Sequence, residues 1–203
     1  MITDDLLNLA EGLLHIIQNS FDEQVWYEAG WYSNSEEARA WLNAGWKDPY
    51  DAREWYNAGW RDPEVAFDWY EFGWIKEQSA AYNFYKAGWR DPHEALKWFS
   101  AGWRYSDVAY AWYKAGWHFS PREAYKWYCI GWKNQKEALD WYNAGFKFPE
   151  LAMKWYRAGW RCPKIAFAWH NAGWKDPKAI LSWKKNGYDN LAKVLKEFER
   201  RSK

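Results

Sequence analysis

The sequence predicts an all-α protein: an α-solenoid of twelve 14-residue single-helix repeats with a capping helix at each end. Glycine recurs every 14 or 15 residues, and all 21 tryptophans fall on two positions of the resulting unit, four residues before the glycine or directly after it. A short unit repeated along most of a chain indicates a repeat architecture. The glycines that set the register are Gly30, Gly45, Gly59, Gly73, Gly88, Gly102, Gly116, Gly131, Gly145, Gly159, Gly173 and Gly187.

Each unit is expected to be one short helix with defined ends, as residues 91–103 illustrate. Asp91 is a good N-cap, and Pro92 suits the first helical position because it needs no amide donor there. Gly102 falls where a helix ends in the left-handed conformation. In such a Schellman ending the residue after the glycine packs back on the third-last helical residue, here Trp103 on Trp98. The two tryptophans of each unit are therefore predicted to touch.

Two apolar rows along each helix indicate that the helices stack. A small residue, most often alanine, lies three positions before the helix tryptophan and four before a recurrent tyrosine, which forms one face. The position after the alanine is also mostly apolar, and it forms a second face. A helix of about ten residues is marginal alone in water, so its stability must come from neighbours on both faces.

The glycine spacing is 15 instead of 14 at three places, each separated by three units. One interpretation is a super-unit of three helices and 43 residues, comparable in size to an armadillo repeat. The other is three unrelated insertions in tolerant loops. The sequence leaves both open.

The chain is expected to form a single repeat domain over residues 1–203. Residues 1–18 are predicted to contain an N-terminal cap helix, residues 19–188 the twelve repeats, and residues 189–203 a charged C-terminal cap helix. Such atypical ends are usual in stacked arrays, because the last repeats must face solvent.

Composition favours a non-enzymatic, cytoplasmic protein. The acidic N-terminus does not resemble a signal peptide, no apolar run is long enough to span a bilayer, and the two cysteines show no disulfide or metal-ligand spacing. No histidine pairs with a second ligand or nucleophile at a useful spacing. We therefore expect no catalytic residues, no cofactor and no metal.

Cations follow the second aromatic position in most units, and two interpretations of this stripe compete. A cation just beyond a helix C-terminus stabilises the helix dipole by about 0.3–1 kcal/mol, which would account for the whole stripe. Alternatively, a regular row of cations could meet phosphates or carboxylates. The helix-dipole interpretation is favoured for the stripe as a whole.

The asymmetry of charge along the chain carries more functional weight. Residues 1–102 contain 8 Lys and Arg against 18 Asp and Glu, whereas residues 103–203 contain 20 against 9. Such a difference between halves favours an anionic partner or a charged interaction end. The cations of the candidate surface are Arg104, Lys114, Arg122, Lys126, Lys133, Lys147, Lys154, Arg157 and Arg161.

The stretch Glu-Ala-Leu-Asp-Trp-Tyr-Asn-Ala at 137–144 resembles the Ala-x-x-Trp-Tyr-x-Lys-Ala portion of Sel1-like and related tetratricopeptide-class repeats, over about eight residues per unit. Those families are α-solenoids that hold other proteins together, and the resemblance implies the same class here. The chain departs from them in its 14-residue period, its identical helices and its lack of a Gly-x-Gly loop. It also resembles tandem Trp-x-x-Ala-Gly-Phe/Trp repeats of uncharacterised microbial proteins, which imply no function.

Three functions follow as hypotheses. The first is a scaffold or adaptor that binds a protein partner through its charged surface, the use to which curved helical arrays are commonly put. The second is nucleic-acid binding through the basic residues 103–203, since helical repeats can read RNA. The third is head-to-tail self-association of the acidic and basic ends, which gives homo-oligomers as rings or filaments.

Overall fold

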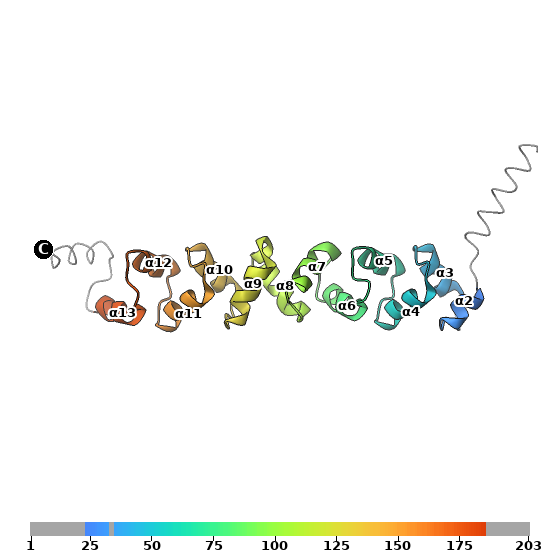
Figure 1. Cartoon of the computed structure of the whole chain (residues 1–203), viewed down its shortest axis with the longest axis horizontal. Helices are drawn as coiled ribbons and strands as arrows, with labels where there is room; N and C mark the ends of the chain where they lie inside the picture. Colours follow the sequence, from blue (N-terminus) through green and yellow to red (C-terminus); the bar gives the residue numbers. More distant parts are fainter. Residues whose placement is uncertain (1–22, 33–34, 186–203) are drawn as a thin grey trace, which may run out of the picture. The chain divides into compact units, whose positions relative to one another are not determined.

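The computed structural model describes residues 23–32 and 35–185, and every regular element in these ranges is helical (Figure 1). The predicted cap helices in 1–18 and 189–203 lie outside the described residues. The chain divides into two compact units, and the division falls between Leu96 and Lys97 in the sequence. We call them the N-terminal and the C-terminal unit. The prediction of one domain over 1–203 stays a prediction.

The helices begin and end as the repeat predicts. The N-terminal unit contains α2 (Glu23–Glu28), α3 (Ser35–Asn43), α4 (Pro49–Asn57), α5 (Pro63–Glu71), α6 (Gln78–Lys86) and the start of α7 (Pro92–Ser100). The C-terminal unit contains the rest of α7, then α8 (Ser106–Lys114), the 3-10 turn η1 (Trp117–Phe119), α9 (Pro121–Cys129), α10 (Gln135–Asn143), α11 (Pro149–Arg157), α12 (Pro163–Asn171) and α13 (Pro177–Lys185). The all-α prediction is confirmed for the described part of the chain.

Aspartate caps start several helices because their carboxylates satisfy amides that have no partner within the helix. Asp91 Oδ1 accepts hydrogen bonds from the backbone N–H of His93 at 2.9 Å and of Glu94 at 3.1 Å. Asp48, Asp62 and Asp176 accept equivalent bonds at the starts of α4, α5 and α13. These predicted caps are confirmed.

The Schellman ending is also confirmed. In α7 the amide of Gly102 donates to Phe99 O at 3.0 Å and the amide of Trp103 donates to Trp98 O at 3.3 Å. The rings of Trp98 and Trp103 lie 5.2 Å apart, and the same pair of positions is in contact in the other units where both are tryptophan. We call the first member the helix tryptophan and the second the closing tryptophan.

Within each unit, helices pack on the helix two places further along the chain. This pairing joins α3 to α5 and α4 to α6 in the N-terminal unit, and α10 to α12 and α11 to α13 in the C-terminal unit. Figure 1 shows α3 and α5 on one side of their unit and α4 and α6 on the other. The helices of each unit therefore form two rows, in agreement with a helical solenoid. The insertions seen in the sequence fall in connections, such as η1, and leave this pairing unchanged.

The closing tryptophan holds this pairing together through its indole N–H. Trp46 Nε1, after α3, donates to Pro63 O at the start of α5 at 3.0 Å. Six other described closing tryptophans make the same bond to the first residue of the helix two places on, at 2.9 to 3.3 Å: Trp31, Trp60, Trp74, Trp103, Trp117 and Trp160. Trp132 makes it at 3.5 Å. The closing tryptophan thus links two helices as well as ending one.

The helix tryptophans and the alanine row form the core. The tryptophans whose burial is described are buried, except the half-buried Trp174. The second apolar row covers the helix end two places back, so that Phe67 of α5 lies against Gly45 and Tyr82 of α6 lies against Gly59. The described tryptophans are therefore committed to the fold.

Candidate functional site

Apolar side chains are exposed at several helix starts of the C-terminal unit, where the N-terminal unit has aspartate. Tyr105 is the N-cap of α8 and Phe148 the N-cap of α11, and neither makes a side-chain cap bond. Phe119 directly precedes the cap Ser120 of α9. These three rings are 67%, 69% and 51% exposed for Tyr105, Phe148 and Phe119. Each directly follows a basic residue or histidine in the sequence.

Phe148 lies at a cleft of about 610 Å³ between α9 and α11, which we call the aromatic cleft. Its lining residues come from α9, from Tyr142 of α10, from the connection after α10 and from the first turn of α11. They are Glu123, Lys126, Tyr142, Lys147, Phe148, Pro149 and Glu150. Phe119 extends the aromatic wall, since its ring lies 5.3 Å from that of Tyr142.

The two lysines of the aromatic cleft are held in different ways. Lys126 Nζ pairs with Glu123 Oε1 at 2.6 Å on the same helix. Lys147 Nζ lies 3.6 Å from the centre of the Tyr142 ring and donates to Tyr142 O at 3.1 Å. A cation over a tyrosine ring is attracted to its negative face. Both ammonium groups remain exposed, so the cleft presents positive charge beside apolar rings.

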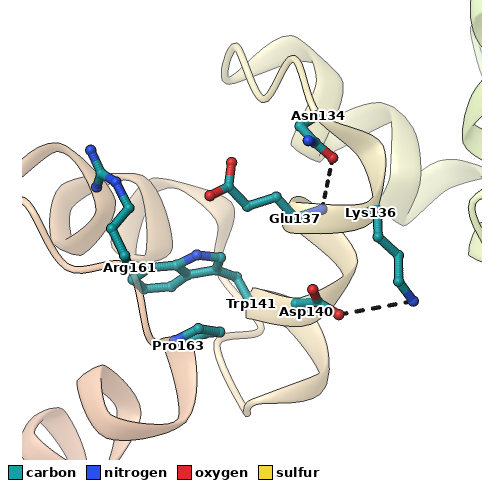
Figure 2. Close-up of a pocket in the computed structure, with 7 residues that line it drawn as sticks. All are labelled: Asn134, Lys136, Glu137, Asp140, Trp141, Arg161 and Pro163. Atoms are coloured by element: carbon teal, nitrogen blue, oxygen red, sulfur yellow. Dashed lines mark hydrogen bonds and ion pairs between the residues drawn. The ribbon is translucent and has the colours of Figure 1, made fainter.

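A second cleft, of about 320 Å³, lies between α10 and the start of α12. Figure 2 shows Glu137 extending from α10 toward the side of the cleft where Arg161 lies, with Trp141 and Pro163 below these two side chains in the view. On its other side Lys136 Nζ lies 4.0 Å from Asp140 Oδ1. We call it the α10–α12 cleft. Its charges are mixed, and its exposed ion pair contributes little to stability.

The structure places the nine candidate cations at exposed positions but brings only some of them to a cleft. Lys126 and Lys147 line the aromatic cleft, and Arg161 lines the α10–α12 cleft. Lys154 Nζ donates to Lys175 O at 3.2 Å, and Lys114 Nζ lies 6.0 Å from the Tyr110 ring. The remaining members of the set lie at no described cleft and are Arg104, Arg122, Lys133 and Arg157.

The arginines of the basic stripe contact the helix ends beside them. Arg104 Nη1 donates to Phe99 O at 2.7 Å and Arg161 Nη1 to Tyr156 O at 2.7 Å. Arg61 makes the same contact to Tyr56 O, beside the acidic cap Asp62. This is the contact that the helix-dipole interpretation predicts, because the last carbonyls of a helix carry its negative end. These guanidinium groups are therefore partly occupied by their own helices.

Sequence reasoning missed the exposed aromatics. It distinguished the two halves of the chain by their charge alone. The signal was an apolar residue at a position where the rest of the array has a polar cap, as in Lys147-Phe148-Pro149 compared with Lys47-Asp48-Pro49.

The fold defines a class, a Trp-rich helical repeat protein with regularly spaced short helices. No family model, curated protein or solved structure matches the chain. Within the described residues no helix is both long and apolar enough to cross a membrane. The same residues contain no group of three or more His, Cys, Asp or Glu suited to a metal ion.

Proposed function

We propose that this protein is a non-enzymatic helical-repeat adaptor that binds a protein partner through the C-terminal unit, with the aromatic cleft at the centre of the interface. The observation that carries the proposal is the exposed Phe148 at an N-cap position, beside Lys147 and at the edge of a cleft. A polar cap at this position would stabilise the helix by about 1 kcal/mol, so the fold gains nothing from phenylalanine here.

Exposed aromatics next to cations are typical of binding surfaces. Interface cores are enriched in aromatic residues and arginine, and a few such residues carry most of the binding energy. Phe119, Tyr142 and Phe148 supply apolar area, and Lys126 and Lys147 supply charge. A partner segment with an apolar side chain flanked by carboxylates fits this arrangement.

Two further considerations support a protein partner. Solenoids present extended surfaces to other proteins, and the repeat resembles Sel1-like and tetratricopeptide-class units that do so. In addition, Glu123 and Glu150 line the aromatic cleft together with the lysines. A polypeptide can offer both signs of charge to such a surface, whereas a phosphate backbone offers only negative charge.

Nucleic-acid binding by the basic half is the second candidate, and the exposed rings beside cations favour it. Single strands bind to proteins by stacking bases on aromatic side chains along a positively charged groove. Tyr105 and Phe119 are exposed enough to stack, whereas the closing and helix tryptophans are buried. The two carboxylates of the aromatic cleft argue against phosphate there.

Head-to-tail self-association is the third candidate. It rests on the acidic residues 1–102 and the basic residues 103–203, which would attract each other between copies. Charge-driven assembly of this kind weakens as salt screens the charges. Light scattering at about 20 mM and about 500 mM salt tests self-association. A molar mass that is the same at both salt concentrations rejects charge-driven assembly.

The test of the proposed function is affinity capture with immobilised protein, comparing the wild type with Lys126→Glu/Lys147→Glu. The matched control is Lys47→Glu, which reverses an exposed charge at the equivalent repeat position of the N-terminal unit. We expect a stoichiometric protein partner that the control retains and the double variant loses.

Two results would overturn the proposal. One is a partner that both variants retain equally. The other is recovery of RNA or DNA alone, with binding that falls steeply as salt increases, which would establish the nucleic-acid candidate instead.

A further inference from the structure

The contact between α10 and α12 resembles the contact between α3 and α5, with two of its five packed rings changed. Equivalent positions differ by 100 in number. Around Trp46 lie Trp41, Trp55, Phe67 and Tyr70; around Phe146 lie Trp141, Trp155, Phe167 and His170. We call these two contacts the α3–α5 joint and the α10–α12 joint. The α3–α5 joint serves as the standard joint, with which the α10–α12 joint is compared.

The first change removes the link between the helices. In the α3–α5 joint Trp46 Nε1 donates to Pro63 O at 3.0 Å. The side chain of Phe146 has no N–H, so the carbonyl of Pro163 receives no indole bond at the α10–α12 joint. The Phe146 ring lies farther from His170, at 5.9 Å compared with 4.9 Å between Trp46 and Tyr70, although it lies nearer to Phe167, at 5.2 Å compared with 5.6 Å between Trp46 and Phe67.

The second change puts a titratable ring where the standard joint has tyrosine. Tyr70 donates its hydroxyl hydrogen to Asp51 Oδ2 at 3.0 Å, which ties α5 to α4. The equivalent positions are His170 and Leu151, which cannot form this bond. Instead, Nδ1 of His170 is buried and has no hydrogen-bond partner. A buried polar atom without a partner destabilises the packed state relative to an opened one.

Two neighbouring features weaken the same joint. The N-cap of α12 is Cys162, which makes no side-chain cap bond, whereas Asp62 caps α5. The α10–α12 cleft opens beside the unlinked residue Pro163 and reaches the buried Trp141 (Figure 2). Helix α12 therefore lacks three interactions that α5 has: the indole bond from the preceding row partner, the aspartate cap and the hydroxyl bond to the neighbouring helix.

We propose that the α10–α12 joint is a proton-sensitive joint, at which α12 separates from α10 more readily than α5 separates from α3 and does so increasingly as His170 gains a proton. The charged groups that act on His170 are Lys154 of α11 and Lys175 of the connection after α12. Phe146 and Trp155 face the ring without charge. Among the described residues, no carboxylate contributes to the pKa shift of His170.

The sign of the effect follows from this surrounding. Burial lowers the pKa of His170 from its ordinary 6.5, and Lys175 and Lys154 lower it further. The opened state, in which the ring is hydrated, therefore binds the proton more readily than the packed state. The joint has its full stability above about pH 6.5 and loses stability as the pH falls below it.

Amide hydrogen exchange of the full chain tests the proposal, with protection factors corrected for the intrinsic rate at each pH. The amides compared are those of Phe167 in α12 and Phe67 in α5, at pH 7.5 and 5.5. We expect Phe167 to be less protected than Phe67 at both values. Acidification should lower the protection of Phe167 about twofold or more while leaving that of Phe67 unchanged.

Two variants separate the contribution of the titratable ring from that of the missing indole bond. Each installs the residue found at the equivalent position of the α3–α5 joint. His170→Tyr should abolish the pH dependence. Phe146→Trp should raise the protection of Phe167 at both pH values and keep the pH dependence. The reciprocal pair Trp46→Phe/Tyr70→His should transfer the weak, pH-dependent behaviour to α5.

Three results would overturn the proposal: equal protection of Phe167 and Phe67 in the wild type, a pH dependence that persists in His170→Tyr, or a reciprocal pair that leaves α5 unaffected. Because tyrosine and tryptophan occupy these positions in the standard joint, the variants are expected to fold.

Discussion

At the scale of single residues, the two tryptophans of a unit differ in how their indole N–H groups are used. The closing tryptophan donates to the helix two places on, as Trp103 does to Pro121 O at 3.0 Å. The helix tryptophans Trp55, Trp127, Trp141 and Trp155 are buried and their Nε1 atoms have no partner. In each of these cases a ring one helix further on stands roughly perpendicular at 6.0 to 6.2 Å. One position provides hydrogen bonding and apolar area, the other apolar area alone.

This difference predicts that the same Trp→Phe substitution lowers the free energy of unfolding by different amounts at the two positions. Trp103→Phe removes ring volume and a hydrogen bond, whereas Trp127→Phe removes the same volume and an N–H without a partner. The first variant should be destabilised by about 1 kcal/mol or more relative to the second. Urea unfolding of both variants measures the difference. Equal midpoints would show that the indole bond contributes nothing.

A second prediction concerns the helix-ending glycines, at which Gly→Ala substitutions should lower stability by different amounts. Gly59 has φ +116°, and a Cβ there would lie 2.5 Å from the Tyr82 ring; Gly131 has φ +97°, and nothing lies within 4 Å of its Cβ position. Gly131→Ala should cost about 1 to 2 kcal/mol for the left-handed backbone alone. Gly59→Ala should cost about 1 to 3 kcal/mol more because Tyr82 must move. Thermal unfolding that ranks the two in the opposite order would refute this packing.

At the scale of helices, the cap residue determines how firmly each short helix begins. Asp62 Oδ1 accepts from the amides of Glu64 and Val65, both at 3.2 Å, whereas Cys162 makes no such bond at the equivalent start of α12. A nine-residue helix has few intrahelical bonds, so a missing cap is a large fraction of its local stability.

An exchange of these two caps tests that statement. Cys162→Asp should stabilise the protein by about 1 kcal/mol, and Asp62→Cys should destabilise it by a similar amount. Differential scanning calorimetry of the two single variants against the wild type provides the measurement. Shifts of the same sign in both variants would contradict the role assigned to the cap.

Much of the helix geometry could be predicted from the sequence because it is local. The Asp-Pro starts, the glycine ends and the contact of Trp98 with Trp103 all depend on residues a few positions apart. The partner of each helix could not be predicted in this way. In a periodic sequence, a contact between neighbouring units and one between alternate units involve the same residue types, so the pattern does not tell α4 from α5 as the partner of α3.

The candidate site was predictable only in part, for a related reason. Charge is visible in composition, and Lys126 and Lys147 were among the expected cations. The exposure of a side chain cannot be read from the sequence in this way. Most aromatic residues of the repeat form its core, and the sequence does not distinguish Phe148 from them. Its exposure follows from its position before Pro149, outside the buried faces of α11.

At the scale of the whole molecule, the proposed function assigns stability and recognition to different sets of residues. The tryptophans, alanines and glycines repeat in both units and build the two rows of helices. Some cap positions differ between the units: Asp48 and Asp62 cap helices of the N-terminal unit, whereas the exposed rings of Tyr105 and Phe148 occupy cap positions in the C-terminal unit. Substitution on the second set should therefore change binding without damaging the array.

Phe148→Asp tests this central claim most directly, because it recreates the Asp-Pro start of α4 and removes the ring at the aromatic cleft. Stability and partner capture are measured on the same preparation. We expect the Tm to rise by about 2 to 4 °C, as about 1 kcal/mol of capping predicts for a chain of this size, while capture of the partner is lost. A lower Tm together with undiminished capture would contradict the account.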